Sequence, residues 1–230
     1  AEISTRKAIE IKPDYAEAYS NLGSILKKSG EIIAAEESIR KGIKLNGGIP
    51  ELYFNLGCIL MEQNSLFEAE LSFKKSIKLR DNFASAYLNL GIVLRLEGKL
   101  KEAERSTLKA LKIDSTVEKV YLNLAQIKSA HGKLTNEGSF FKEAILYNQK
   151  ALEINPFSSL AKVDLLFNCS KICDWDLLSK NIEWLDTLGI DGEPINPLTL
   201  MALEDDPLKD LKRAKNYYKQ NFCKSKRNIS

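Results

Sequence analysis

The chain has 230 residues, of which 44% are hydrophobic and 28% are charged, and its formal net charge is +3. This composition is typical of a soluble globular protein, and the absence of any run of about 18 apolar residues excludes a membrane-spanning helix. The four cysteines follow no disulfide-framework spacing, so we expect free thiols in a reducing compartment and a cytoplasmic protein.

A five-residue pattern returns along the first two thirds of the chain. Tyr19-Ser20-Asn21-Leu22-Gly23 is followed by close copies at residues 53–57, 87–91 and 121–125, each 34 residues after the last. A fixed period of this length indicates one supersecondary unit copied along the chain. Apolar residues within each unit recur at helical spacing, so each unit is predicted to be a pair of helices.

Other positions keep the same period. Gly30, Asn64, Gly98 and Gly132 recur every 34 residues, and a permissive residue is expected at the turn between the two helices at Gly30, Asn64 and Gly98. Small residues, where helices approach closely, recur in two series: Ala35, Ala69 and Ala103, and Ala8, Gly42, Ser76 and Ala110. Over residues 1–157 the chain resembles the tetratricopeptide repeat family. The resemblance implies an all-α fold, a right-handed superhelix of helix hairpins with a concave inner wall.

We divide this region into a half repeat at 1–15 and repeats at 16–49, 50–83, 84–117 and 118–157. The half repeat matches only the second helix of a unit, so we expect a fragment of a longer array. Apolar surface left uncovered there is expected to favour end-to-end self-association without biological meaning. The fourth repeat carries seven extra residues near 135–141. Seven residues are close to two helical turns, but Gly138 and the polar composition favour a protruding loop over longer helices.

Beyond residue 157 the repeat pattern fades. Residues 158–188 predict a degenerate helical hairpin, with Asp174 or Asp176 capping its second helix. Residues 189–206 form a turn-rich connector, and residues 207–230 a basic terminal helix and tail, with Asp206 and Pro207 at its start. For this helix we expect a solvated basic face and a packed apolar face, rather than a nucleic-acid or membrane surface.

The candidate binding site is a row of asparagines, one at the same position of each repeat: Asn21, Asn55, Asn89 and Asn123. A carboxamide both donates and accepts hydrogen bonds, so a row of them on the inner wall could hold the main chain of an extended peptide. The alternative is that these side chains bond within the stack. Asp164 continues the row if the fifth hairpin keeps register. A carboxylate clamp of the chaperone-tail type is not expected, because Ser85 and Asn89 stand where cations would be needed.

Cysteine and histidine residues suggest no catalytic or metal site. Cys169 and Cys173 are four residues apart and could share a helix face, but His131 is the only histidine. We therefore expect a buried thiol, a capping Asp174 and an apolar Trp175 at a helix corner. His131, just before Gly132, is expected to cap carbonyl groups at a helix end.

A narrower resemblance covers residues 169–217. Cys173-Asp174-Trp175, then Asn196-Pro197-Leu198 and Asp205-Asp206-Pro207, resemble the segment between the repeats and the catalytic domain of O-linked N-acetylglucosamine transferase and SPINDLY-like glycosyltransferases. The resemblance implies that the asparagine row contacts substrate polypeptide. No nucleotide-sugar site is visible, so we expect a non-catalytic chain with no cofactor and no metal. The predicted function is peptide recognition for a protein O-glycosyltransferase; the alternative is a stand-alone tetratricopeptide scaffold for complex assembly.

Overall fold

The structure is a computed structural model that describes residues 1–191, 193–201 and 203–221. Within these ranges the secondary structure is entirely helical, which confirms the predicted all-α fold. The chain forms two compact units, Ala1–Ser115 and Thr116–Ser230. Each unit is described by itself below.

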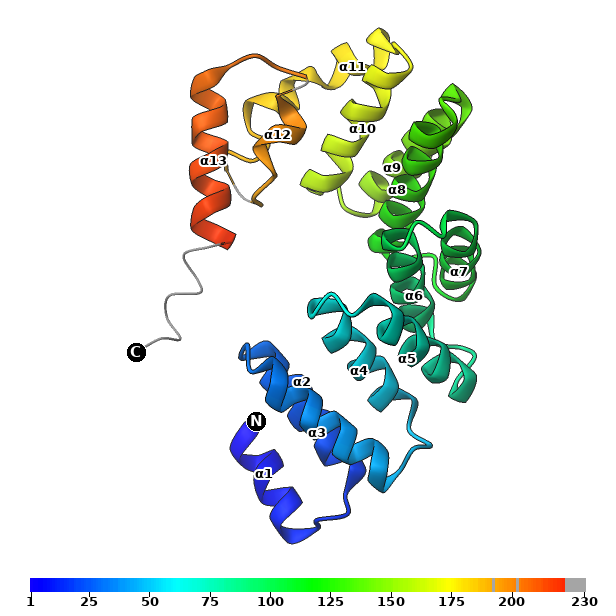
Figure 1. Cartoon of the computed structure of the whole chain (residues 1–230). Coiled ribbons are helices and arrows are strands. Elements are labelled where there is room, and N and C mark those ends of the chain that lie inside the picture. Colours follow the sequence, from blue (N-terminus) through cyan, green and yellow to red (C-terminus); the bar gives the residue numbers. More distant parts are fainter. Residues whose placement is uncertain (192, 202, 222–230) are drawn as a thin grey trace. The chain divides into compact units, whose positions relative to one another are not determined.

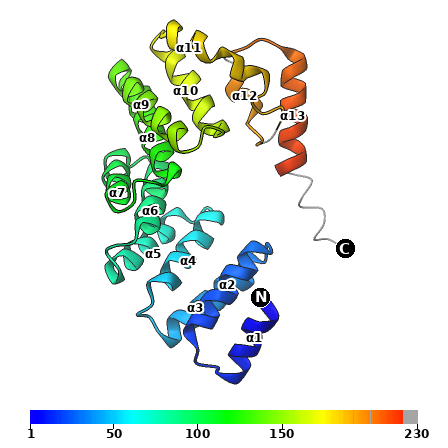
Figure 2. The same ribbon diagram turned by 180° about the vertical axis from the view of Figure 1, so that it is seen from behind.

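The first unit consists of one single helix and three helix hairpins (Figures 1 and 2). The single helix, α1 (Glu2–Ile11), corresponds to the half repeat and has no buried residue; Ile3 and Ile11 are 84% and 76% exposed. The hairpins are α2 (Ala16–Lys28) with α3 (Ile32–Leu45), α4 (Pro50–Glu62) with α5 (Leu66–Leu79), and α6 (Ala84–Leu96) with α7 (Leu100–Ile113).

Two features give each hairpin of the first unit its shape: a left-handed turn residue and a glycine at the contact between the helices. Gly30 and Gly98 have positive φ angles of 86° and 77°, and Asn64 has 61°, so the predicted turn positions adopt the left-handed conformation. The glycine of the repeated motif instead lets the helices approach. A Cβ atom added at Gly57 would lie 2.7 Å from the ring of Phe73, which faces it from α5.

The fourth hairpin corrects the prediction of a protruding loop near 135–141. Helix α8 (Glu118–Thr135) has 18 residues against 13 in α6, and α9 (Gly138–Ile154) has 17 against 14 in α7. Only Asn136 and Glu137 lie between them, one residue fewer than between α6 and α7, which accounts for all seven extra residues. The alternative of longer helices is therefore right: α8 gains about one and a half turns and α9 just under one turn, with the turn residues between their extended ends.

The turn moves with this extension. Gly132 keeps the 34-residue period of Gly30, Asn64 and Gly98 and is expected at a helix end, but it lies inside α8, where an added Cβ would come within 2.8 Å of the Phe141 ring. The left-handed turn residue is instead Asn136, with φ 58°. His131 is also inside α8, so the prediction that it caps a helix end is wrong.

The second unit continues with a fifth, shorter hairpin. Helix α10 (Ser159–Lys171) is followed by α11 (Trp175–Asn181) and a 3₁₀ turn at Ile182–Asp186. The cap of α11 is Asp174, whose Oδ1 accepts a hydrogen bond from the Leu177 backbone N–H at 3.0 Å. The chain then returns through α12 (Pro197–Leu200) to pack on α10, in a cluster of five buried residues: Val163, Leu166, Leu185, Leu188 and Leu200.

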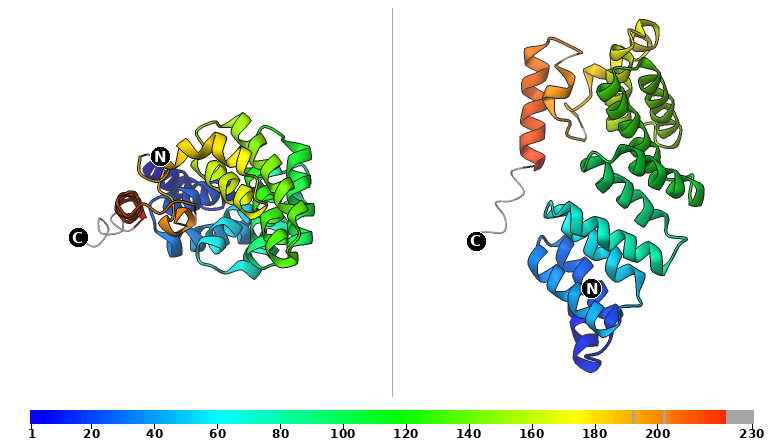
Figure 3. Two further views of the ribbon diagram at one scale, coloured as in Figure 1. Left: turned by 90° about the horizontal axis from the view of Figure 1, so that it is seen from above. Right: turned by 45° about the vertical axis from the view of Figure 1, so that its right-hand side comes forward.

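The last helix, α13 (Pro207–Asn221), lies beside the connector of the second unit (Figure 3). Asp206 Oδ1 accepts hydrogen bonds from two backbone N–H groups of its first turn, at 3.0 and 3.1 Å, as predicted for the cap. The prediction that the apolar face of this helix is the one that packs is wrong. Leu208, Leu211 and Tyr218 are 73%, 51% and 59% exposed, whereas Arg213 is fully buried.

Arg213 is buried because the chain it faces offers oxygen atoms. Its Nη2 donates to the Leu185 carbonyl at 2.6 Å and to Glu204 at 2.8 Å, and its Nε donates to the Leu188 carbonyl at 3.0 Å. Its Nη1 donates to Asp210 at 3.1 Å. A guanidinium has five donors in a fixed plane, so it can satisfy several acceptors at a helix end and a turn together. The predicted tail, residues 222–230, lies outside the described residues.

Candidate peptide-binding site

The first helices of three successive repeats form one continuous face in the first unit. Helix α2 contacts α4, and α4 contacts α6. Asn21, Asn55 and Asn89 occupy the same repeat position on these helices, and each is the sixth residue of its helix. We call the surface of α2, α4 and α6 that carries these three side chains the asparagine face.

The three carboxamides differ in burial and in hydrogen bonding. Asn21 is exposed. Asn55 is half-buried, and its Nδ2 donates to Ser20 Oγ of the preceding repeat at 3.1 Å. Asn89 is half-buried, and its Nδ2 donates to Cys58 Sγ at 3.3 Å. The sequence analysis gave hydrogen bonding between repeats as the alternative to peptide binding. Asn55 and Asn89 each use one amide hydrogen in this way.

Hydrogen-bonding capacity remains on both half-buried asparagines. A carboxamide has two N–H hydrogens and a carbonyl oxygen, and the bonds to Ser20 and Cys58 each use one hydrogen. Among the described residues, no donor reaches the carbonyl oxygen of Asn55 or of Asn89. These bonds also fix the orientation of the side chains. The carboxamides are thus positioned and still able to accept an N–H from another chain.

Beside Asn55 the face is hollowed between α2 and α4. The hollow has a volume of about 170 Å³ and is lined by Gly23, Ser24, Lys27, Lys28, Phe54, Asn55, Cys58 and Ile59. Lys27 Nζ pairs with Glu62 across the two helices at 2.9 Å. Burial raises the pKa of the Cys58 thiol, so the group stays neutral there. The sequence analysis did not identify Cys58 as a residue of this site. Its position three residues after Asn55, about one helical turn, is the signal that could have identified it.

The fourth asparagine differs from the other three. Asn123, on α8 of the second unit, is only 3% exposed. Its side chain is therefore much less accessible to a peptide than those on the asparagine face.

The fifth hairpin keeps register at Asp164. It follows Asn123 by 41 residues, which is the period of 34 plus the seven-residue extension. Its Oδ2 accepts a hydrogen bond from Gln126 at 3.3 Å. Gln126 holds the repeat position of Cys58, so Asp164 contacts the preceding repeat in the way that Asn89 does. Asp164 is half-buried and continues the row with a carboxylate.

The other candidate residues, a histidine, two cysteines and a tryptophan, differ in burial. The ring of His131 stacks on Phe140, with 5.1 Å between the centroids, and its buried Nε2 has no partner. Cys169 is buried, and burial, with the nearby Asp174 carboxylate, raises the pKa of its thiol to about 11. Cys173 is exposed, and Trp175 is 60% exposed. Within the described ranges, His, Cys, Asp and Glu side chains gather nowhere in a group of three that could hold a metal ion.

None of the helices described combines the length and the apolar character needed to cross a membrane.

Comparisons with known proteins identify the repeats. Tetratricopeptide repeat profiles match residues 5–37, 50–83 and 84–116. No curated protein matches the sequence.

Several solved structures share the fold. YrrB, described as a TPR protein with an unusual peptide-binding site, is 20% identical, with a TM-score of 0.61 over 94% of this chain and 100% of that chain. PilW, a widely conserved type IV pilus biogenesis factor, is 18% identical, with a TM-score of 0.73 over 83% and 86%. PilF from Pseudomonas aeruginosa is 19% identical, with a TM-score of 0.68 over 93% and 87%. At residues 5–37 and 50–116, therefore, this all-helical chain consists of tetratricopeptide repeats.

Proposed function

We propose that the protein is a peptide-binding module whose asparagine face holds an extended polypeptide segment mainly through its main chain. The observation that carries the proposal is the row itself: Asn21, Asn55 and Asn89 stand at one repeat position on three adjacent helices. The carbonyl oxygens of the two half-buried members are oriented and available. Main-chain N–H and C=O groups recur along any extended peptide, so such a row suits many sequences. The described peptide-binding site of YrrB supports the same kind of use.

The test replaces Asn55 and Asn89 together with alanine. An array of labelled, unstructured fifteen-residue peptides first identifies a binder of the unaltered protein. Each lost hydrogen bond contributes roughly 0.5–1.5 kcal/mol, so the double variant should bind that peptide about 5–150-fold more weakly. The control is Asn82→Ala, since Asn82 is exposed and lies in the turn before α6, outside the three helices that form the face.

A second comparison separates main-chain from side-chain recognition. The same peptide, N-methylated at successive main-chain amides, loses the donors that the asparagine carbonyls would accept. At two or more positions N-methylation should weaken binding as strongly as the double alanine variant. If N-methylation and the alanine variant both leave the affinity unchanged, the asparagine face is not the peptide site.

The finer proposal is that this module presents substrate proteins to an O-glycosyltransferase domain. Its support is the resemblance of residues 169–217, with the corner at Cys173, Asp174 and Trp175 and the caps at Asn196 and Asp206. Free thiols at the three described cysteines support a reducing, cytoplasmic location. The downstream gene sequence is the test. A two-lobed glycosyltransferase encoded in frame would support this context, and a stop codon directly after Ser230 would support the stand-alone scaffold.

A further inference from the structure

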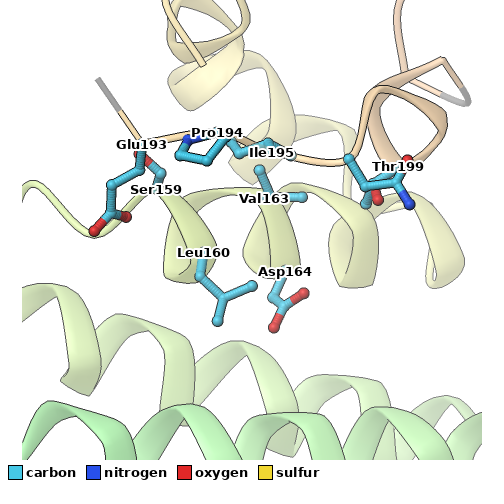
Figure 4. Close-up of a pocket in the computed structure, with 9 residues that line it drawn as sticks. Ser159, Leu160, Val163, Asp164, Glu193, Pro194, Ile195 and Thr199 are labelled. Atoms are coloured by element: carbon cyan, nitrogen blue, oxygen red, sulfur yellow. The ribbon is translucent and has the colours of Figure 1, made fainter. Parts of the chain in front are cut away.

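The second unit contains a hollow that the asparagine face does not include. It lies between the first two turns of α10 and connector residues 193–199, the last three of which belong to α12 (Figure 4), and it has a volume of about 440 Å³. This is within the roughly 300–1,000 Å³ of ligand pockets. It is lined by Ser159, Leu160, Val163, Asp164, Glu193, Pro194, Ile195, Asn196 and Thr199.

Buried packing holds the two walls of this hollow together. Val163 on α10 and Leu200 on α12 are 2% and 0% exposed and belong to one apolar cluster, against which Ile195 packs. Asn196 Oδ1 accepts the Leu198 N–H at 3.1 Å and starts α12. The connector is thus anchored on both sides of the hollow, and the hollow is present before any ligand binds.

The lining combines an apolar floor with carboxylates. Val163, Pro194 and Ile195 lie together and form an apolar floor, and Leu160, which is 43% exposed, extends from α10 on the same side as Asp164. In Figure 4 the Asp164 carboxylate extends from the same side of α10 as Leu160, and the Glu193 carboxylate extends from the connector. An apolar side chain fits the floor, and a cation fits the carboxylates.

An adjoining hollow is also lined by carboxylates and apolar side chains. It shares Ser159 and Glu193 and adds Asp191 and Phe157, whose ring is 85% exposed. The one cation in this second hollow, Lys162, lies over the Trp184 ring, 5.3 Å from its centroid. Within the part of the chain that the structure describes, the side chains of Asp191 and Glu193 form no ion pair or hydrogen bond. Lys162 lines this hollow without pairing with either carboxylate, so Asp191 and Glu193 favour a positively charged ligand.

We propose that these joined hollows bind a short basic peptide segment, in which an apolar side chain fills the floor and neighbouring lysine or arginine side chains reach Asp164 and Glu193. At Asp164 the repeat position that carries a neutral carboxamide in four earlier repeats carries a negative charge. The asparagine face would recognise main chain whatever its sequence, whereas this site would select for positive charge. The site is built from the second unit alone and does not depend on the asparagine face.

The test uses a fluorescein-labelled seven-residue peptide with a central leucine flanked by two lysines in a Gly-Ser context. The unaltered protein should bind it, and high salt should weaken the binding because the contacts are charged. Versions with glutamates in place of the lysines, or serine in place of the leucine, should not bind. The variant combines Asp164→Asn, which restores the residue of the earlier repeats, with Glu193→Gln. It should weaken binding about tenfold.

Two controls decide where the peptide binds. Glu183→Gln removes an exposed carboxylate of the same unit outside the hollows and should leave the affinity unchanged. The double alanine variant of Asn55 and Asn89 should also leave it unchanged, so failure of one site is distinguishable from failure of the other. Equal binding of the glutamate peptide, or wild-type affinity in the Asp164→Asn, Glu193→Gln variant, would overturn the proposal. So would the absence of binding at millimolar peptide.

Discussion

Replacing Arg213 with methionine should detach α13 from the connector of the second unit. Methionine keeps much of the aliphatic length of arginine but has no N–H donors. The change therefore leaves the Leu185 and Leu188 carbonyls without the partners that they have at 2.6 and 3.0 Å. It also removes the guanidinium from Glu204 and Asp210, whose side chains are each only 18% exposed.

The expected cost is about 3 kcal/mol. Removing one member of a buried ion pair costs roughly 3–5 kcal/mol, because the remaining charge is left buried. The lower end applies here, since Lys209 Nζ still pairs with Glu204 at 2.5 Å. Burial alone would raise the pKa of Glu204, and hydrogen bonds from Lys209 and Arg213 lower it below its usual value. Losing one of the two donors leaves the carboxylate charged and more weakly stabilised.

Hydrogen exchange on α13 measures this cost locally. We expect the free energy of opening of the α13 amides to fall by about 3 kcal/mol in Arg213→Met, while amides of α4 and α5 in the first unit keep their protection. The matched control is Lys212→Met, which removes an exposed cation from the neighbouring position of the same helix. If the two variants exchange within about 0.5 kcal/mol of each other, the Arg213 contacts do not hold α13.

Three further outcomes test other parts of the structure. Gly132→Ala should destabilise the second unit by about 1–3 kcal/mol in urea denaturation, because its Cβ would meet the Phe141 ring at 2.8 Å; Gly138→Ala, with its nearest neighbour at 3.6 Å, should not. Asp206→Ala should reduce α13 protection by about 1 kcal/mol, less than Arg213→Met, since only a helix cap is lost. Burial raises the pKa of Glu70, but hydrogen bonds from lysines outweigh it and bring the pKa to about 2. Because this pKa is lowered on folding, the stability that it contributes is present above about pH 4.5 and lost as the pH falls towards 2. A pH series of urea midpoints for Glu70→Gln should lack that part of the decline, and an unchanged decline would contradict the ion-pair interpretation.

The repeats could be predicted because their signals are local and periodic. The turn positions at Gly30, Asn64 and Gly98 need the left-handed conformation, and each repeat supplies a residue that adopts it at the same place. The caps at Asp174 and Asp206 likewise depend on a few consecutive residues. The turns and the caps each depend on a few neighbouring residues, and because the turns also recur every 34 residues, the period predicts the hairpins.

Composition alone could not show whether the seven extra residues form a loop or lengthen the two helices. Gly138 and its polar neighbours indicated a loop, yet Gly138 opens α9 and the helices lengthen on both sides. Phe141 packs against Gly132, and this contact between the helices outweighs the weak local preference. Only the packed hairpin shows that the turn residue is Asn136.

The tertiary structure alone decided how the candidate sites are formed. The sequence placed Asn21, Asn55, Asn89 and Asn123 at one repeat position but could not distinguish the exposed Asn21 from the buried Asn123, because burial depends on what the neighbouring helices present. For the same reason the sequence assigned the apolar face of α13 to the interior. The surface that α13 meets presents the Leu185 and Leu188 carbonyls and the Glu204 carboxylate, and burying those oxygens without a donor would cost more than exposing two leucines.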